Sequence, residues 1–146
     1  MSVTLEQAST IVDIALKTAR DKKQMPQTIV VLDAGGHVVC AKREDNSGIF
    51  RYEIAVGKAY GALGFGWGSR TSMERAAQNP AFFAAVGMAS GGRLVPNPAG
   101  VLIRDANNKV LGAVGISGDT GDNDEIIAIA GIEAAGLKAD PGGSKK

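Results

Sequence analysis

The sequence predicts one α/β domain of the α+β type, in which an antiparallel sheet of two or more β-hairpins is flanked by helices. Two pairs of extended apolar segments, at residues 28–41 and 100–117, are each joined by a short turn, as in a β-hairpin. Apolar residues repeat at helical spacing before, between and after these pairs. The expected order of elements is therefore α-ββ-αα-ββ-α, with helices on the faces of the sheet.

The first expected helix follows Thr4. Thr4 and Gln7 have the spacing of a capping box, in which each side chain satisfies a backbone donor at the start of a helix. The apolar residues that follow at helical spacing are Leu5, Ala8, Ile11, Val12, Ala15, Leu16 and Ala19. A charged segment at 21–23 and then Pro26 end this helix.

The two hairpins carry the clearest strand signals. The first has a β-branched segment at 28–32, a turn over 33–36 and a second extended segment at 37–41. The second repeats this pattern over 100–117. Both turns follow an aspartate, whose side chain can accept hydrogen bonds from the turn backbone.

Helices are also expected between the hairpins. Over residues 50–64, Gly57 and Gly61 lie four apart and share one helix face. Each glycine costs a helix about 1 kcal/mol relative to alanine, so we expect a neighbouring segment to pack very closely there. A short helix is expected from Thr71, followed by one or two further turns after Pro80.

The last expected helix opens in the acidic segment 122–125, because acidic side chains favour a helix N-terminus. This segment lacks the ligand spacing of an EF-hand, so we expect a capping loop and no metal site. No change of composition marks a domain boundary. Residues 1–139 are expected to form a single domain, and residues 140–146 a disordered C-terminal tail.

Composition excludes several functional classes. The net charge is +1 with no basic stripe, which argues against binding to nucleic acid. No apolar run approaches the roughly 18 residues of a membrane span, and no signal peptide is recognisable. Cys40 is the single cysteine, so no internal disulfide can form, and we expect a reducing, cytoplasmic location.

Five segments, taken in order, resemble the GlcG/HbpS family of haem-binding-type proteins. They are VLDAGGHVV at 31–39, AVGKAY at 55–60, GGRLVP at 91–96, LGAVGISG at 111–118 and DE at 124–125. The resemblance covers about residues 4–137 and extends to the C-terminal domain of PduO-type cobalamin adenosyltransferases. It implies a profilin-like fold, a homo-oligomer, and haem or a related tetrapyrrole as the small-molecule ligand.

His37 is the only histidine and therefore the first candidate axial ligand, in a pocket near the first hairpin. Arg93 and Arg51 are candidate anchors for the anionic groups of such a ligand. The alternative for His37 is a residue at the exit of a turn, bonded to the backbone. Cys40 lies three residues farther along the strand and should point to the opposite face, so we expect it to be a small core residue and not a second ligand of the same iron.

A second hypothesis is an isomerase, tautomerase or lyase that acts on a carboxylate-bearing metabolite. Lys58 stands in an apolar, glycine-rich helix, and a desolvated lysine beside Asp33 or Glu125 would form a proton-transfer site. This requires the first turn, the Lys58 helix and the start of the last helix to converge. The structural alternatives are a surface lysine, a turn-forming aspartate and a glutamate at a helix start.

A third hypothesis is an accessory subunit that acts through its oligomer interface. Trp67 lies among glycines in an irregular segment. Its two interpretations are a pocket wall and an interface anchor, and we expect the interface anchor. This hypothesis predicts no enclosed pocket.

Overall fold

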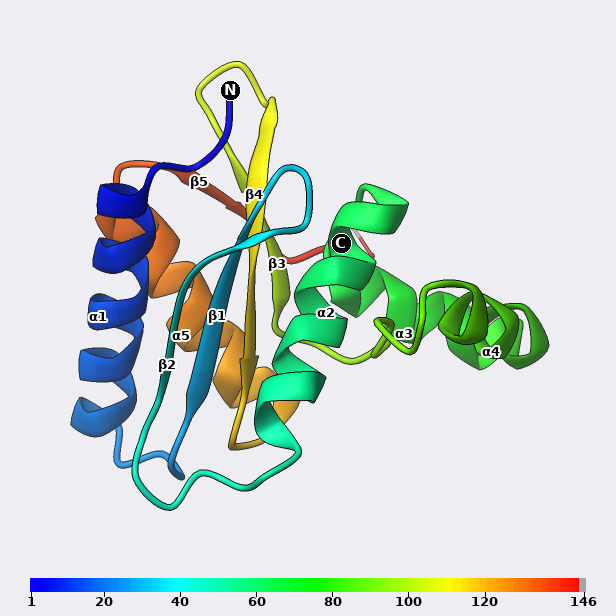
Figure 1. Cartoon of the computed structure of the whole chain (residues 1–146), viewed down its shortest axis with the longest axis horizontal. Coiled ribbons are helices and arrows are strands. Elements are labelled where there is room, and N and C mark those ends of the chain that lie inside the picture. Colours follow the sequence, from blue (N-terminus) through cyan, green and yellow to red (C-terminus); the bar gives the residue numbers. More distant parts are fainter. Residues whose placement is uncertain (145–146) are drawn as a thin grey trace.

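The computed structural model of the chain describes residues 1–144 (Figure 1). The elements follow the chain in this order: α1 (Leu5–Asp21), β1 (Thr28–Asp33), β2 (Val38–Arg43), α2 (Arg51–Phe65), α3 (Ser69–Gln78), α4 (Pro80–Ala89), β3 (Gly100–Arg104), β4 (Val110–Ser117), α5 (Gly121–Ala134) and β5 (Lys138–Asp140). The predicted fold class is confirmed. The structure adds a full third helix, α4, between the hairpins, and a short last strand, β5.

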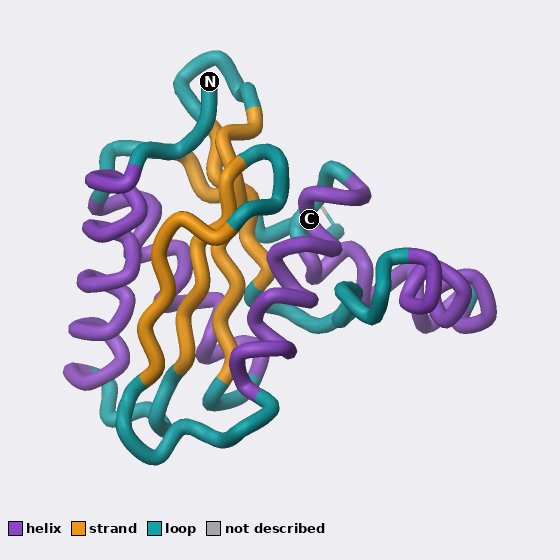
Figure 2. The backbone as a smooth tube through the Cα atoms, in the orientation of Figure 1, coloured by secondary structure: helices purple, strands orange, loops and turns teal. Residues whose placement is uncertain are grey.

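The five strands over residues 1–144 form one sheet in the order β2-β1-β4-β3-β5 (Figure 2). Every neighbouring pair is antiparallel, including β1 with β4, which joins the two predicted hairpins. Helices α1 and α5 cover one face of the sheet, and α2 covers the other (Figure 1). The two helix layers explain why the inner strand β1 is an almost unbroken apolar segment, because it is buried on both faces.

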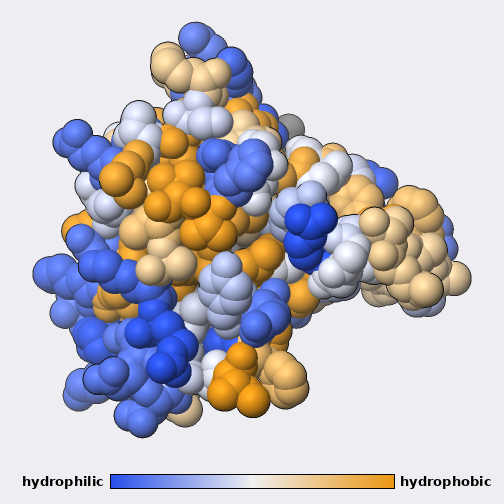
Figure 3. All heavy atoms as spheres, viewed as in Figure 1, coloured by the Kyte–Doolittle hydropathy of each residue, from blue (hydrophilic) through white to orange (hydrophobic). Residues whose placement is uncertain are grey.

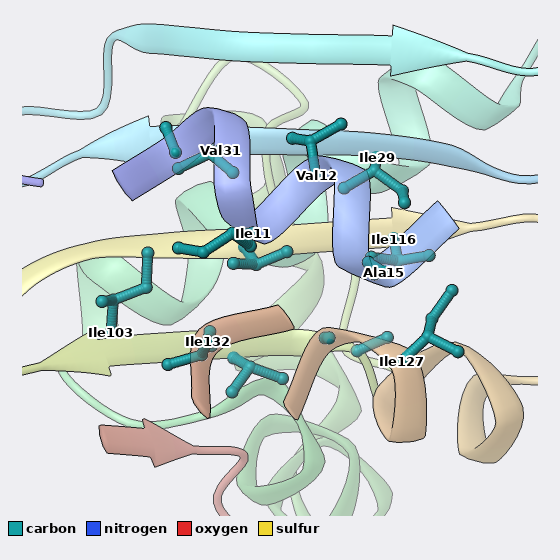
Figure 4. Packing of buried hydrophobic residues seen from close by; sticks show 14 of the residues in the cluster. Ile11, Val12, Ala15, Ile29, Val31, Ile103, Ile116, Ile127 and Ile132 are labelled. Carbon is teal, nitrogen blue, oxygen red and sulfur yellow. The ribbon is translucent and has the colours of Figure 1, made fainter. Parts of the chain in front are cut away.

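The larger core lies between the sheet and the pair α1 and α5 (Figure 4). Its fully buried side chains come from both helices and from three strands, and include Ile11, Val12, Ala15, Ile29, Val31, Ile103, Ile116, Ile127 and Ile132. A smaller core on the other face packs the alanines of α2 against β1, β3 and β4. Small side chains on α2 let this helix lie close to the strands.

Glycines bring α2 still closer to its neighbours. A Cβ atom at Gly115 would overlap the carbonyl oxygen of Ala55 on α2. On the far side of the helix, a Cβ at Gly57 would lie 2.6 Å from Val95, and one at Gly61 would lie 2.7 Å from Leu94. The expectation that a segment packs closely on this glycine face is confirmed, and the segment is the loop that leads into β3.

Predictions for three helices can be compared directly with the structure. The capping box of α1 is present, with Thr4 and Gln7 bonding each other's backbone N–H groups at 3.1 and 3.0 Å. Helix α3 begins at Ser69, two residues before the expected start. Helix α4, expected as one or two turns, is ten residues long and projects from the body (Figure 1).

The expected disordered tail differs most from the structure. Asp140 ends β5, which pairs with β3, and its carboxylate accepts a hydrogen bond from Arg104 Nε at 2.9 Å. Farther along, the N–H of Gly143 donates to Thr71 Oγ1 at 2.8 Å. Residues 140–144 are held because β3 would otherwise present an open edge and α3 offers partners, neither of which is a local sequence signal. The rest of the expected tail, residues 145–146, lies outside the described residues.

Among residues 1–144, no helix combines the length and the apolar character that crossing a lipid bilayer requires.

Candidate functional site

The first candidate site begins at the turn between β1 and β2. Asp33 Oδ1 accepts the backbone N–H groups of Gly35 and His37, each at 2.9 Å, and thereby forms the turn. The His37 N–H is the largest cause of a lowered pKa at Asp33, because it stabilises the charged carboxylate. Asp33 is therefore the turn-forming residue that its position suggested, and it is ionised at neutral pH.

The same carboxylate also contacts the imidazole of His37. Asp33 Oδ1 lies 3.2 Å from Nδ1, while 80% of the His37 side chain is exposed. This contact favours the tautomer with its proton on Nδ1. The other nitrogen, Nε2, then keeps a lone pair with which it can coordinate a metal. His37 is thus a turn-exit residue and, at the same time, an accessible and oriented imidazole.

Tyr60 links this turn to Arg93. Gly36 has a φ of +84°, and a Cβ there would lie 2.7 Å from the Tyr60 ring, so the ring packs against the bare turn. On the other side, the Arg93 guanidinium carbon lies 3.9 Å from the centroid of the Tyr60 ring. The residues Gly36, His37, Tyr60 and Arg93 are called the Tyr60 face below.

A small apolar hollow of about 100 Å³ lies at the edge of the Tyr60 face. It is lined by Tyr60 and Arg93 together with side chains of α2, α4 and the loop before β3, among them Phe65, Val86 and Leu94. Pockets that enclose a ligand usually measure roughly 300 Å³ or more. A large planar ligand would therefore lie on this face instead of inside the single chain.

Arg51, the third predicted cofactor-binding residue, is not part of this face. It begins α2, and its Nη1 donates to Ser117 Oγ at 3.1 Å. Tyr60 lies nine positions later in the helix, which is about 14 Å along the axis. The structure thus connects the turn of His37 to Arg93 through Tyr60, and places Arg51 at the first position of α2.

Lys58 forms a second, buried site. Its side chain is 3% exposed, and Nζ donates to the Ile116 carbonyl at 2.7 Å and to Asp124 Oδ2 at 3.5 Å. Burial is the main cause of a lowered pKa at Lys58, and Asp124 acts in the opposite direction. The alternative of a surface lysine is therefore wrong, because α2 turns this position toward the end of β4.

Two glutamines extend this buried site. Asp124 Oδ1 accepts from Gln27 Nε2 at 2.9 Å and from the Asp119 N–H at 3.0 Å. Gln27 Nε2 also donates to Gln24 Oε1 at 3.0 Å. Among residues 1–144, Gln27 Oε1 is buried and has no hydrogen-bond partner. The network joins the segment before β1 to the start of α5.

The carboxylate partner of Lys58 is Asp124, and neither Asp33 nor Glu125 takes that place. Glu125 faces Arg70, with Oε2 3.0 Å from Nε. Asp33 lies opposite Gly112, whereas Lys58 reaches Ile116, which pairs with Ile29. Asp33 and Ile29 are four positions apart on β1, so Asp33 lies about 13 Å along the strand from the level that the lysine reaches.

Sequence reasoning missed Asp124 and Gln27. The acidic pair at 124–125 marked the start of the helix, but successive helical residues point about 100° apart, and only the packing of α5 decides which carboxylate turns inward. For Gln27, no local signal distinguishes a buried amide from a surface one.

The acidic loop before α5 caps this helix, as expected. Thr120 Oγ1 accepts the Asn123 N–H at 3.2 Å. Asp119 accepts from the Met25 and Thr120 N–H groups at 2.8 and 2.7 Å, which together hold its pKa below the usual value.

Comparison with known proteins places the chain among related sequences. The family described as "haem degrading protein HbpS-like" matches residues 3–133. A 15.0 kDa protein of Citrobacter freundii, from the dhaT-dhaS intergenic region, is 28% identical over 109 residues, which is 75% of each chain.

Solved structures share the fold. The PduOC:heme complex is similar with a TM-score of 0.82 and 20% identity, covering 94% of this chain and 97% of that one. Protein ORFY of Klebsiella pneumoniae is similar with a TM-score of 0.81 and 22% identity, covering 92% and 90%. A double mutant of Streptomyces reticuli HbpS is similar with a TM-score of 0.76 and 25% identity, covering 91% and 86%. Because the family match spans most of the chain, this protein belongs to the HbpS-like family of haem-degrading proteins.

Proposed function

We propose that this chain binds haem, or a related tetrapyrrole, on the Tyr60 face, with His37 Nε2 as the axial ligand. The observation that carries the proposal is an 80% exposed imidazole whose Nδ1 contacts a carboxylate at 3.2 Å. Metal-ligating histidines commonly donate their second ring N–H to a carboxylate, which orients the ring and raises its basicity. Asp33 is placed to do this for His37.

The other residues of the face fit a planar ligand with acidic edges. Arg93 presents a guanidinium beside an apolar surface, where it would pair with a propionate. When bound, the haem supplies an iron centre whose reactivity depends on its axial ligand and surroundings. The family description and the PduOC:heme complex support the choice of ligand class.

The small hollow leaves most of such a ligand uncovered by this chain. A homo-oligomer, in which a second copy covers the exposed side, therefore stays a prediction of this proposal. A cytoplasmic location also stays a prediction, and it rests on the single free cysteine, Cys40.

The experiment is a haemin titration of the purified chain, followed through the Soret band. We expect saturable binding of one haem per chain that is lost in His37→Ala. Asp33→Asn should bind about ten- to a hundredfold more weakly, because it keeps the shape of the turn but loses the charge behind the imidazole. Arg20→Gln, remote from the face, is the matched control and should bind as wild type does.

Far-UV circular dichroism of each variant confirms that it folds. Absence of saturable binding by the wild-type chain would contradict the proposal. Binding that persists unchanged in His37→Ala would contradict the assignment of the ligand.

A second candidate function is proton transfer by an isomerase, tautomerase or lyase at Lys58. The lowered pKa of the Lys58 amine, which lies beside a carboxylate, favours this function. Asp124 is that carboxylate, in place of the expected Asp33 or Glu125. We rank this function below haem binding because the Lys58 side chain is only 3% exposed. A substrate could reach the amine only if α2 moved away from its neighbours. Keto–enol conversion of phenylpyruvate, lost in Lys58→Met, is the test. Equal rates in the two chains would exclude this role for the lysine.

A further inference from the structure

Four of the chain's seven aromatic residues gather where α2 ends and α3 meets the projecting helix α4. They are Phe65, Trp67, Phe82 and Phe83. The sequence of α4, PAFFAAVGMA, contains no charged residue, and in Figure 3 this arm is coloured mostly toward the hydrophobic end of the scale. This group of rings lies outside both sites described above, apart from Phe65, which also borders the small hollow by Tyr60.

Part of the group has a structural role. Phe65 stacks on Trp67 with ring centroids 5.0 Å apart, and packs against Phe83 at 5.2 Å. Phe83 is buried and meets Phe82 edge-on at 5.8 Å. The contact between Phe65 and Phe83 attaches α4 to the body of the protein. These contacts leave Phe82 50% exposed.

Phe82 and its neighbours border a hollow of about 290 Å³. The four aromatic residues line it together with Arg75, Gln78 and Asn79. This volume is at the lower end of the range for small-molecule pockets, which are typically apolar with a few polar groups. Aromatic faces with one cation and two amides fit that description. The term "aromatic hollow" is used for this site below.

Arg75 gives the aromatic hollow its charge. Its guanidinium carbon lies 4.5 Å from the centroid of the Trp67 ring. The ion pairs formed within residues 1–144 do not include Arg75. Trp67 is itself held in place, since Nε1 donates to Ser72 Oγ at 2.9 Å. A guanidinium stacked on a fixed ring keeps its N–H groups at the edge, where they can bond a carboxylate in two places.

We propose that the aromatic hollow binds a small planar aromatic anion of one or two fused rings. The ring of the ligand would pack against Phe82 and Trp67, and its carboxylate would bond Arg75. The site has no histidine and shares neither His37 nor Arg93 with the Tyr60 face. It therefore stands independently of the haem proposal.

The test uses 2-naphthoate as the probe and NMR of the ¹⁵N-labelled chain as the readout. Trp67 is the only tryptophan, so its indole N–H gives a single signal located in the site. We expect a saturable shift of this signal and of backbone signals from α3 and α4. A cation with the same rings, 2-naphthylmethylammonium, should bind at least tenfold more weakly.

Two arginine variants form a matched pair, because each arginine stacks on an aromatic ring. Arg75→Gln should weaken naphthoate binding at least tenfold and remove the preference for the anion over the cation. Arg93→Gln and His37→Ala should leave naphthoate binding unchanged. If Arg93→Gln abolished binding, or if the shifts mapped to the β1–β2 turn, the anion would be bound by the Tyr60 face and the proposal would be wrong.

Sedimentation of wild type and Phe82→Ser tests the competing occupant, a second copy of the chain. Phe82 is half-exposed, so this substitution should leave the fold intact. A wild-type oligomer that Phe82→Ser dissociates, together with an indole signal that naphthoate does not move, would make the hollow an interface and overturn the proposal.

Discussion

The ammonium group of Lys58 on α2 lies 3.5 Å from the carboxylate of Asp124 at the start of α5, and both side chains are at least 97% buried. These helices cover opposite faces of the sheet (Figure 1). The pair meets at the C-terminal end of β4, where Lys58 also donates a hydrogen bond to the Ile116 carbonyl. One buried ion pair therefore joins the two helix layers of the protein.

Removing one charge of this pair should destabilise the fold strongly. In Asp124→Asn the buried ammonium of Lys58 loses its counter-ion, and we expect the free energy of unfolding to fall by about 3–5 kcal/mol. Urea unfolding measures this. Asp122→Asn is the matched control, because Asp122 is 76% exposed and its ion pair with Arg70 should contribute less than about 1 kcal/mol.

The double variant Lys58→Met with Asp124→Asn separates the charge from the packing. Without either charge, the cost of burying the ammonium disappears, so the double variant should be more stable than Asp124→Asn alone. If Asp124→Asn lowered the free energy of unfolding by less than about 1 kcal/mol, the ion pair would contribute no more than an exposed one, and the prediction would be wrong.

The stability of the fold should also depend on the titration of Lys58. Burial lowers its pKa in the folded chain below the ordinary value of 10.5 that applies when the chain is unfolded. Between the two pKa values the unfolded chain binds one more proton at this residue than the folded chain does. The contribution of Lys58 to the free energy of unfolding therefore rises as the pH is raised through the lowered pKa toward 10.5.

Chemical unfolding at a series of alkaline pH values measures this effect, with Lys58→Met as the reference for all other groups. We expect the stability of the wild type, relative to that of the variant, to increase toward pH 10.5. Parallel pH profiles for the two chains would show that the pKa of Lys58 is not lowered by folding.

The closeness of α2 to the sheet can be tested at two glycines. A Cβ at Gly115 would overlap the Ala55 carbonyl oxygen, and neither backbone can move without disturbing the sheet or the helix. We expect Gly115→Ala to lower the free energy of unfolding by about 3 kcal/mol. Gly64→Ala is the control, because a Cβ at this exposed position of α2 would have no neighbouring atom within 4 Å.

Alanine has a higher helix propensity than glycine. Gly64→Ala should therefore stabilise the protein by about 0.5–1 kcal/mol. Thermal unfolding of both variants measures the difference. Equal effects of the two substitutions would disprove the close approach of the helix to β4.

Local signals predict most of the fold. The capping box at Thr4, the aspartate turn at Asp33 and the β-branched segment of β1 depend on residues a few positions apart, and the structure confirms each of them. The paired glycines of α2 also indicate a close neighbour, although not which one. The family resemblance is likewise readable from short segments in order, and the family match confirms it.

The missed features all depend on residues far apart in the chain. Strand β5 exists because Leu102 and Ile103 offer an open edge far earlier in the chain, and the short segment has no strand signal of its own. Helix α4 is attached to the body through the contact of Phe83 with Phe65, whose ring centroids lie 5.2 Å apart. In both cases the stabilising partner is invisible to local patterns.

For the candidate sites, the amino-acid sequence alone specifies which chemical groups exist: one imidazole, one lysine among glycines and a few carboxylates and arginines. Their grouping comes from tertiary packing. It sets His37 beside Asp33, packs Tyr60 against both Gly36 and Arg93, places Arg51 at the start of α2, and pairs Lys58 with Asp124. The reason is physical: turn geometry is local, whereas burial and charge pairing depend on how helices pack on the two faces of a sheet.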